Sequence, residues 1–197
     1  MGWLAVASGF VGTYAQFRRA RTLGVHGVSL ATWSLFVYMG CFWITYGVVA
    51  RSWEVTLGSL IALPMQVGIL VRLKPWERWQ VPARALGYFV VCCVAPTMLW
   101  GWAGGVYGTG VAMTINRAPQ LIELIRERDA SGVSSTSWYI GAVGCTLWIT
   151  YYTGAHLWAA LVATACAGVA NLVIALMATW RHLQARSVLI VNEALAV

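Results

Sequence analysis

The tetrapeptide Trp43-Ile44-Thr45-Tyr46 occurs a second time as Trp148-Ile149-Thr150-Tyr151, 105 residues further along the chain. Neighbouring residues repeat at the same offset, and the pairs are Gly27-Val28-Ser29 with Gly132-Val133-Ser134, Trp33 with Trp138, and Gln66 with Asn171. An ordered series of matches at one offset indicates an internal duplication, because a chance match would not extend to its neighbours. The sequence therefore predicts two copies of one structural unit.

The composition is that of a membrane protein. Of the 197 residues, 60% are hydrophobic and 10% are charged, and the mean hydropathy is +0.71. A helix needs about 20 apolar residues to cross the hydrocarbon, and stretches of that kind run over residues 2–20, 29–49, 54–73, 84–102, 104–124, 136–153 and 157–179. Runs such as 159–178 are apolar on every face, which only a helix can carry through lipid. We therefore expect an all-α polytopic membrane protein with seven transmembrane helices.

The basic residues predict the orientation, since Lys and Arg are retained in cytoplasmic loops. With the N-terminus outside, every Lys and Arg except Arg51 lies in an inner loop, at an inner helix end or in the C-terminal tail. This distribution predicts a plasma (inner) membrane protein with a cytoplasmic C-terminus. The formal charge of +7 is then explained by topology and by attraction to anionic membrane lipids. Nucleic acid is not an expected partner, because the sequence contains no basic soluble domain.

Duplication and topology together predict the domain organisation. Three spans form one repeat in residues 1–80, and three form the second repeat in residues 104–183. Two three-helix units fused directly would be inverted, so the extra span in residues 81–103 restores a parallel orientation. Residues 184–197 are expected to form a cytoplasmic tail. Parallel repeats related by an axis along the membrane normal enclose a transport path in known carriers.

Each repeat carries a polar stripe on its third span. Ser59 and Gln66 are seven residues apart, as are Thr164 and Asn171, so each pair shares one face of a helix. Amides facing the bilayer are unfavourable, and the stripe is therefore expected to face the bundle interior or a water-filled cavity, where it binds a solute. Hydrogen bonding between helices, without a substrate, is the alternative.

The repeated tetrapeptide places an aromatic pair on one face of the second span of each repeat. Trp43 and Tyr46 are three residues apart, and so are Trp148 and Tyr151. We expect a stacking indole ring deep in a cavity and a phenol that closes it nearer the outer surface. The alternative is the aromatic belt at the membrane interface, which accounts for most of the 12 Trp.

The first span of each repeat carries hinge or gate candidates. Pro119 interrupts the hydrogen-bond ladder and predicts a hinge in the fifth span, whereas its counterpart is Ala15. Gln16 and Gln120 are placed where a side-chain amide can satisfy backbone groups freed by a kink. Arg117 lies one turn before Gln120 and is expected to extend to the inner surface, with binding of an anionic solute as the alternative.

The second repeat resembles a PQ-loop repeat, and the residues that carry the resemblance are Arg117-Ala118-Pro119-Gln120, Ser131-Gly132-Val133-Ser134, Trp138 and Trp148-Ile149-Thr150-Tyr151. The whole chain, with three, one and three spans, resembles the SWEET sugar transporters in their seven-helix form. That resemblance implies a sugar facilitator in which Trp43 and Trp148 stack on the solute, and in which the matching Tyr closes the extracellular side. The family's Asn positions hold Ser59 and Thr164 here. A hydroxyl is shorter and offers one donor, which favours looser polyol binding or a different solute.

Other classes of protein are disfavoured by what the sequence lacks. It has no Ser/His/Asp set, no metal-ligand spacing and no phosphate-binding glycine loop, so we expect neither an enzyme nor a metal or cofactor site. Acidic residues are missing from the middle of the spans, which favours passive equilibration over proton coupling.

The expected function is therefore passive transport, by alternating access, of a small neutral hydrophilic solute such as a mono- or disaccharide. A PQ-loop carrier of amino acids or other polar metabolites is the first alternative, because the Asn pair is missing. A membrane receptor or assembly protein on the same fold, without transport activity, is the second alternative.

Overall fold

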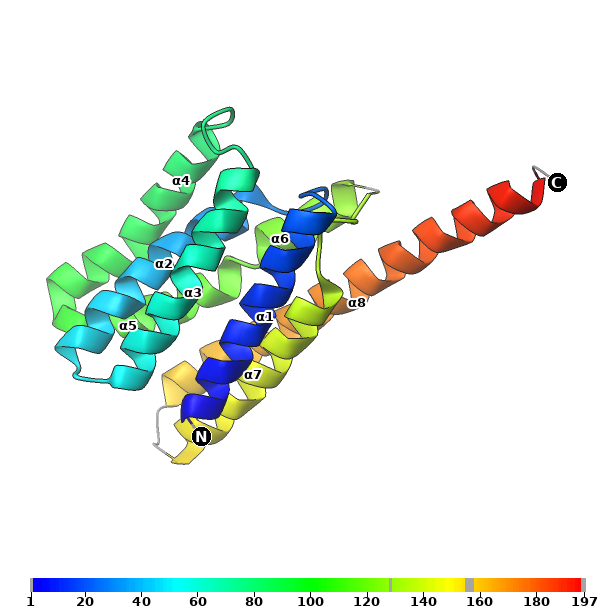
Figure 1. The fold of residues 1–197 in the computed structure, drawn as a ribbon. Coiled ribbons are helices and arrows are strands. Elements are labelled where there is room, and N and C mark those ends of the chain that lie inside the picture. Colours follow the sequence, from blue (N-terminus) through cyan, green and yellow to red (C-terminus); the bar gives the residue numbers. More distant parts are fainter. Residues whose placement is uncertain (1, 128, 155–157, 196–197) are drawn as a thin grey trace.

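The computed structural model describes residues 2–127, 129–154 and 158–195, and the regular structure in this part of the chain is all helical (Figure 1). The elements are α1 (Gly2–Thr22), α2 (Leu30–Val49), α3 (Trp53–Arg72), α4 (Gln80–Phe89), the π-helical turn η1 (Val90–Val94), α5 (Ala95–Ile115), α6 (Ala118–Arg126), α7 (Ser135–Gly154) and α8 (Trp158–Leu195). The predicted all-α class is confirmed.

Four helical stretches in the described part of the chain are long and apolar enough to cross a membrane. They are Leu30–Val49, Trp53–Arg72, Gln80–Arg126 and Thr164–Ser187. The third joins α4, η1, α5 and α6, and its 47 residues are more than twice the number of about 20 that one crossing takes. These lengths agree with an integral membrane protein.

The long helices pack in two groups with the same internal order. α3 contacts both α1 and α2, and α8 contacts both α5 and α7. Between the groups, α1 packs along α7, and α2 contacts α6. Figure 1 shows that the connections α1–α2, α3–α4 and α6–α7 lie at one end of the bundle, while the N-terminus and the α2–α3 connection lie at the other.

The chain reverses inside α5 at Gly101, whose φ of 69° and ψ of −166° are not helical. A backbone of that kind is readily adopted only by glycine. The limbs on either side pack closely because Gly104 and Gly108 have no side chain where the carbonyl groups of Pro96 and Cys92 approach them. The predicted boundary between the fourth and fifth apolar stretches coincides with this turn.

The final helix, α8, continues well beyond the apolar stretch that was expected to end near residue 179. It runs without interruption from Trp158 to Leu195, and Figure 1 shows its C-terminal part projecting beyond the bundle. The sequence from 180 to 195 contains neither glycine nor proline, so nothing in it ends a helix. The segment predicted to be a tail is therefore helical up to Leu195.

The largest buried cluster lies where the two Gly-Val-Ser loops meet the helices. Both halves of the chain contribute to it in matching ways, through Val28 and Val133 from the loops and through Trp33 and Trp138 from the first turns of α2 and α7. Leu124 of α6 completes the contact and is fully buried. The apolar core is therefore in direct contact with the two Gly-Val-Ser loops, which form part of the candidate site.

Candidate functional site

Two loops of the same sequence begin the two helices that carry the repeated tetrapeptide. The Ser29 hydroxyl accepts a hydrogen bond from the N–H of Thr32 at 3.3 Å, and the Ser134 hydroxyl accepts one from the N–H of Ser137 at 3.1 Å. Serine is favoured here because its side chain satisfies an N–H that the first turn of a helix leaves without a partner. The duplicated sequence therefore folds into a duplicated helix start.

The side chain of Gln16, on α1, reaches the second of these loops. Its Nε2 donates to the Gly132 carbonyl at 2.8 Å, and its Oε1 accepts from the N–H of Ser134 at 2.7 Å. Only 1% of Gln16 is exposed, so water does not compete for these bonds. One carboxamide thus satisfies both a buried carbonyl and a buried N–H of the loop.

Gln120, on α6, makes the equivalent contact with the first loop. Its Nε2 donates to the Gly27 carbonyl at 2.6 Å, and its Oε1 accepts from the N–H of Ser29 at 2.9 Å. We call Gln16 and Gln120, with their four hydrogen bonds, the glutamine clamps. The sequence predicted that these amides serve backbone groups freed by a kink in their own helix; the bonds instead run to the loop of the opposite half.

The two loops also pack directly on each other. The N–H of Gly132 donates to the His26 carbonyl at 3.1 Å. A Cβ atom on Gly132 would lie 2.6 Å from the Gly24 carbonyl oxygen, and one on Gly27 would lie 2.9 Å from that of Asp129. Gly27 in addition has a φ of +73°, in the left-handed region that favours glycine. Backbone-to-backbone contact at this point requires both glycines.

An exposed carboxylate shapes the second loop, and its effect depends on pH. The Ser131 N–H donates to Asp129 at 2.8 Å, and this bond is the main reason why the pKa of Asp129 lies below 3.8. The stabilisation is therefore complete above about pH 5, where the carboxylate is ionised in the unfolded chain as well, and is lost as the pH falls through the lowered pKa of Asp129. We expect the melting temperature of the wild type relative to Asp129→Asn to fall between pH 5 and pH 3. A difference that stays constant over this range would contradict the role of the carboxylate.

The helical chain breaks just before Pro119, between α5 and α6. Proline has no N–H to offer to the carbonyl of Ile115, so the ladder of helical hydrogen bonds is interrupted here. The Asn116 carbonyl in the break accepts a hydrogen bond from the hydroxyl of Thr32 at 2.9 Å. In contrast, α1 runs unbroken through Ala15. The break is where the hinge was predicted; movement about it stays a prediction.

Arg117 does not extend to the inner surface, and the prediction that it does is wrong. Its side chain is 6% exposed and turns into the bundle. Nε donates to Oδ1 of Asn171 at 2.5 Å, and Nη1 donates to Oδ1 of Asn116 at 2.9 Å. Nη1 also donates to the carbonyl of Met113. The break at Pro119 frees carbonyl groups at the end of α5, and a cation placed there finds acceptors close by.

The polar stripes of the two repeats differ in burial. On α8, Thr164 is 7% exposed and Asn171 is 3% exposed, whereas Ser59 and Gln66 on α3 are half-buried. Asn171 is held by its bond to Arg117, whereas the buried Oε1 of Gln66 has no hydrogen-bond partner among the described residues. The stripe on α8 therefore faces the bundle interior, as predicted; its contact with a solute stays a prediction.

The two aromatic pairs have the same geometry. The rings of Trp43 and Tyr46 meet edge to face, with centroids 5.7 Å apart and an interplanar angle of 80°. Those of Trp148 and Tyr151 are 5.8 Å apart at 84°. Both indoles are half-buried, and Tyr151 is 46% exposed. The pairs are thus equivalent in structure as well as in sequence, although their role in a gate is untested.

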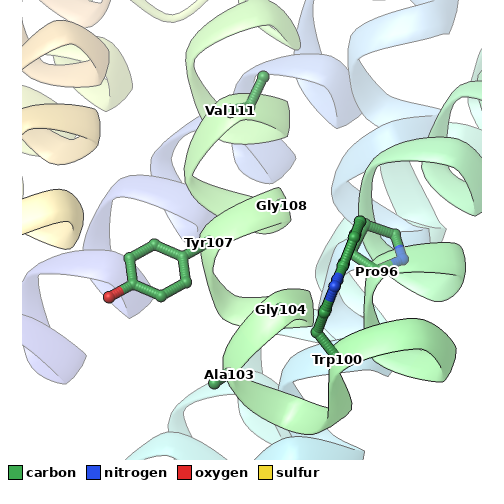
Figure 2. A pocket seen from close by; sticks show the side chains of 7 residues that line it. All are labelled: Pro96, Trp100, Ala103, Gly104, Tyr107, Gly108 and Val111. Atoms are coloured by element: carbon green, nitrogen blue, oxygen red, sulfur yellow. The ribbon is translucent and has the colours of Figure 1, made fainter.

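The predicted solute-binding residues do not line the two clefts that flank the turn at Gly101. One cleft, of about 430 Å³, lies between the limbs of α5 beside Pro96, Trp100 and Tyr107 (Figure 2). The other, of about 300 Å³, lies next to Phe42. Both are lined mostly by apolar groups, which suit lipid chains better than a hydrophilic solute.

Sequence reasoning missed two features of this site, the crossing of the glutamine clamps and the inward direction of Arg117. The sequence did contain a signal for the inward direction of Arg117, because a cation two residues before a proline in an apolar span has freed carbonyl groups available to it. No protein-family model, curated protein or solved structure matches this chain, so its function is inferred from its own residues and contacts.

Proposed function

We propose that this protein is a PQ-loop carrier that moves a small hydrophilic solute passively across a membrane by alternating access. The observation that carries the proposal is the pair of glutamine clamps, in which the first helix of each repeat holds the loop of the other. These reciprocal contacts join the two repeats at the end of the bundle where the Gly-Val-Ser loops lie. The rest of the interface between the repeats does not contain the clamp bonds. A carrier needs an end that can close and open in this way.

The proposed topology is seven crossings, as three, one and three, with the N-terminus outside. The matching order of helices supports it, since the third helix of each repeat packs between the other two. The reversal at Gly101 lets α4 and η1 cross in one direction and the rest of α5 return. The positive charge at the end with the clamped loops supports the assignment of that end to the cytoplasm.

The conformation described here is then the one with its cytoplasmic end closed. Opening that end breaks the four bonds of the glutamine clamps. Each neutral hydrogen bond contributes about 0.5–1.5 kcal/mol net, so the four together oppose opening by roughly 2–6 kcal/mol. Once the loops separate, water forms hydrogen bonds with the side-chain amides of Gln16 and Gln120, so the opening step is reversible.

Passive transport is supported by the absence of a buried carboxyl group among the residues whose burial the structure describes. Proton-driven carriers commonly use such a group inside the membrane. The single buried cation, Arg117, keeps its proton at all physiological pH values and does not carry one across. The gradient of the solute itself would drive the flux.

Purified protein in liposomes is expected to equilibrate a hydrophilic solute down its gradient. Trp148→Ala removes the proposed stacking ring, and Thr164→Leu replaces a polar contact by an apolar one. Each is expected to lower the flux by at least about fivefold, which corresponds to roughly 1 kcal/mol. Trp76→Ala, at a site that is 61% exposed in a loop, is the matched control and should leave the flux unchanged. Failure to take up any sugar, polyol, amino acid or small organic acid would overturn the proposal.

A further inference from the structure

Arg117 is a buried cation whose partners are all neutral. It donates to the side-chain oxygens of Asn171 and Asn116 and to the carbonyl of Met113. The ion pairs among the described residues join His26 to Asp129 and Lys74 to Glu77, so none of them involves Arg117. A guanidinium stays charged in proteins and carries five N–H donors, which leaves capacity for a further acceptor.

The fold offsets only part of this charge. The guanidinium lies at the C-terminal end of α5, where the aligned peptide dipoles amount to roughly half a negative charge. About half of the positive charge is then left inside a membrane protein, where burial without a counter-ion is costly. Neutral amide oxygens satisfy the donors geometrically but do not neutralise this charge. The site is therefore complementary to one negative charge.

A buried donor that has no acceptor lies near Arg117. The Nε1 of Trp33, a residue that is 4% exposed, is buried and has no hydrogen-bond partner among the described residues. Both groups contact the same ring: the Phe36 centroid is 5.2 Å from that of Trp33 and 5.9 Å from the guanidinium carbon of Arg117. Indole and guanidinium groups only donate, so the region around Phe36 has donors in excess of acceptors.

The other half of the bundle lacks this cation. The residue equivalent to Arg117 is Thr13, because Arg117 lies three residues before Gln120 and Thr13 lies three residues before Gln16. The Thr13 hydroxyl donates to the Gly9 carbonyl of its own helix. Gln66, the equivalent of Asn171, accordingly keeps a buried oxygen without a donor. The two halves therefore present different chemistry, a donor-rich side at Arg117 and an acceptor at Gln66, which suits a solute with unlike ends.

We propose that the solute carries a carboxylate and that Arg117 binds it. This inference rests on the proposed transport function and replaces the neutral solute expected from the sequence. On binding, the guanidinium exchanges a neutral amide oxygen for a carboxylate oxygen, which accepts a shorter and stronger charge-assisted bond. A phosphate dianion would leave an excess negative charge, because Arg117 is the single buried cation in the described part of the chain. The carboxylate belongs either to a monocarboxylate or to a zwitterionic amino acid.

The test compares lactate with lactamide, which has the same shape but an uncharged amide in place of the carboxylate. The full-length protein in liposomes is expected to take up lactate at least tenfold faster than lactamide or glucose. Arg117→Gln is expected to bring the ratio of lactate to lactamide close to one, and Arg117→Lys to leave it in between. A ratio measured on one preparation does not depend on how much of it is folded.

The membrane potential and alanine distinguish the two sources of the carboxylate. Lactate uptake should rise with an inside-positive potential, because an anion crosses alone, whereas alanine uptake should not respond. Equal uptake of lactate and lactamide by the wild type, or an unchanged ratio in Arg117→Gln, would overturn the carboxylate site and leave transport intact. Complete absence of flux would overturn transport. In that event the site itself stands only if lactate raises the melting temperature of the wild type more than lactamide does, and if Arg117→Gln abolishes the difference.

Discussion

Gln120→Leu is expected to destabilise the protein by about 2–6 kcal/mol, because it leaves the buried Gly27 carbonyl and the buried Ser29 N–H without partners, at about 1–3 kcal/mol each. Gln16→Leu should have a similar effect on the other loop, since the bonds it removes are of the same kind and length. The melting temperature in detergent is the measurement, and a lowering of roughly 5–20 °C is expected for a chain of this size.

The double variant, Gln16→Leu with Gln120→Leu, sharpens this prediction. Both clamps hold the same contact between loops, so the loss of one admits water to the groups of the other. The combined destabilisation should therefore be less than the sum of the single effects. Gln184→Leu makes the same change at an exposed position of α8 and serves as the control. If Gln120→Leu melts at the same temperature as Gln184→Leu, the clamps do not hold the loops.

Gly132→Ala is expected to push the two loops apart. Its Cβ would lie 2.6 Å from the Gly24 oxygen and 2.7 Å from the His26 nitrogen, and backbone atoms cannot turn aside as a flexible side chain can. Overpacking of this kind destabilises by about 1–3 kcal/mol. Gly27→Ala should lower the free energy of unfolding by roughly 1–2 kcal/mol more than Gly132→Ala does, because the φ of +73° at this position is also unfavourable for alanine.

The separation of the loops can be measured directly through a reporter thiol. Val133 is 1% exposed, so Val133→Cys should react slowly with a water-soluble maleimide in the otherwise native protein and much faster when combined with Gly132→Ala. Gly9→Ala is the matched control, since nothing lies within 4 Å of its added Cβ and α1 is helical there. It should leave both labelling and stability unchanged, or stabilise slightly. Labelling that is equally slow in Gly132→Ala would show that the loops tolerate the added methyl group.

Much of the helical framework was predictable, and the reasons are local. Apolar runs of about 20 residues predict membrane-spanning helices whatever their neighbours are, and α1, α2, α3 and α7 begin and end within two residues of the predicted stretches. The reversal at Gly101 was predictable from the two apolar runs on either side of it. The extension of α8 to Leu195 was not, because its sequence is polar enough to be assigned to a tail yet has nothing that ends a helix.

The candidate site was predictable in its residues but not in its contacts. The sequence identified three polar groups in apolar spans, Gln16, Gln120 and Asn171. All three side chains are buried, and each forms hydrogen bonds. Their partners were not identified, because a carboxamide bonds equally well to any carbonyl or N–H within reach. Arg117 was expected to extend to the inner surface because a long side chain near a helix end can do so.

The sequence by itself determined the duplication, which follows from comparing residues at a fixed offset, and the helical class, which depends on apolar runs of residues close together in the chain. Only the tertiary structure decided that each glutamine crosses to the loop of the other half, and that Arg117 turns inward to Asn171, 54 residues away. The physical reason is that buried polar groups must find partners wherever the packing of helices places them. That packing depends on contacts between distant segments, and the order of residues alone does not specify which of several equivalent acceptors will be near.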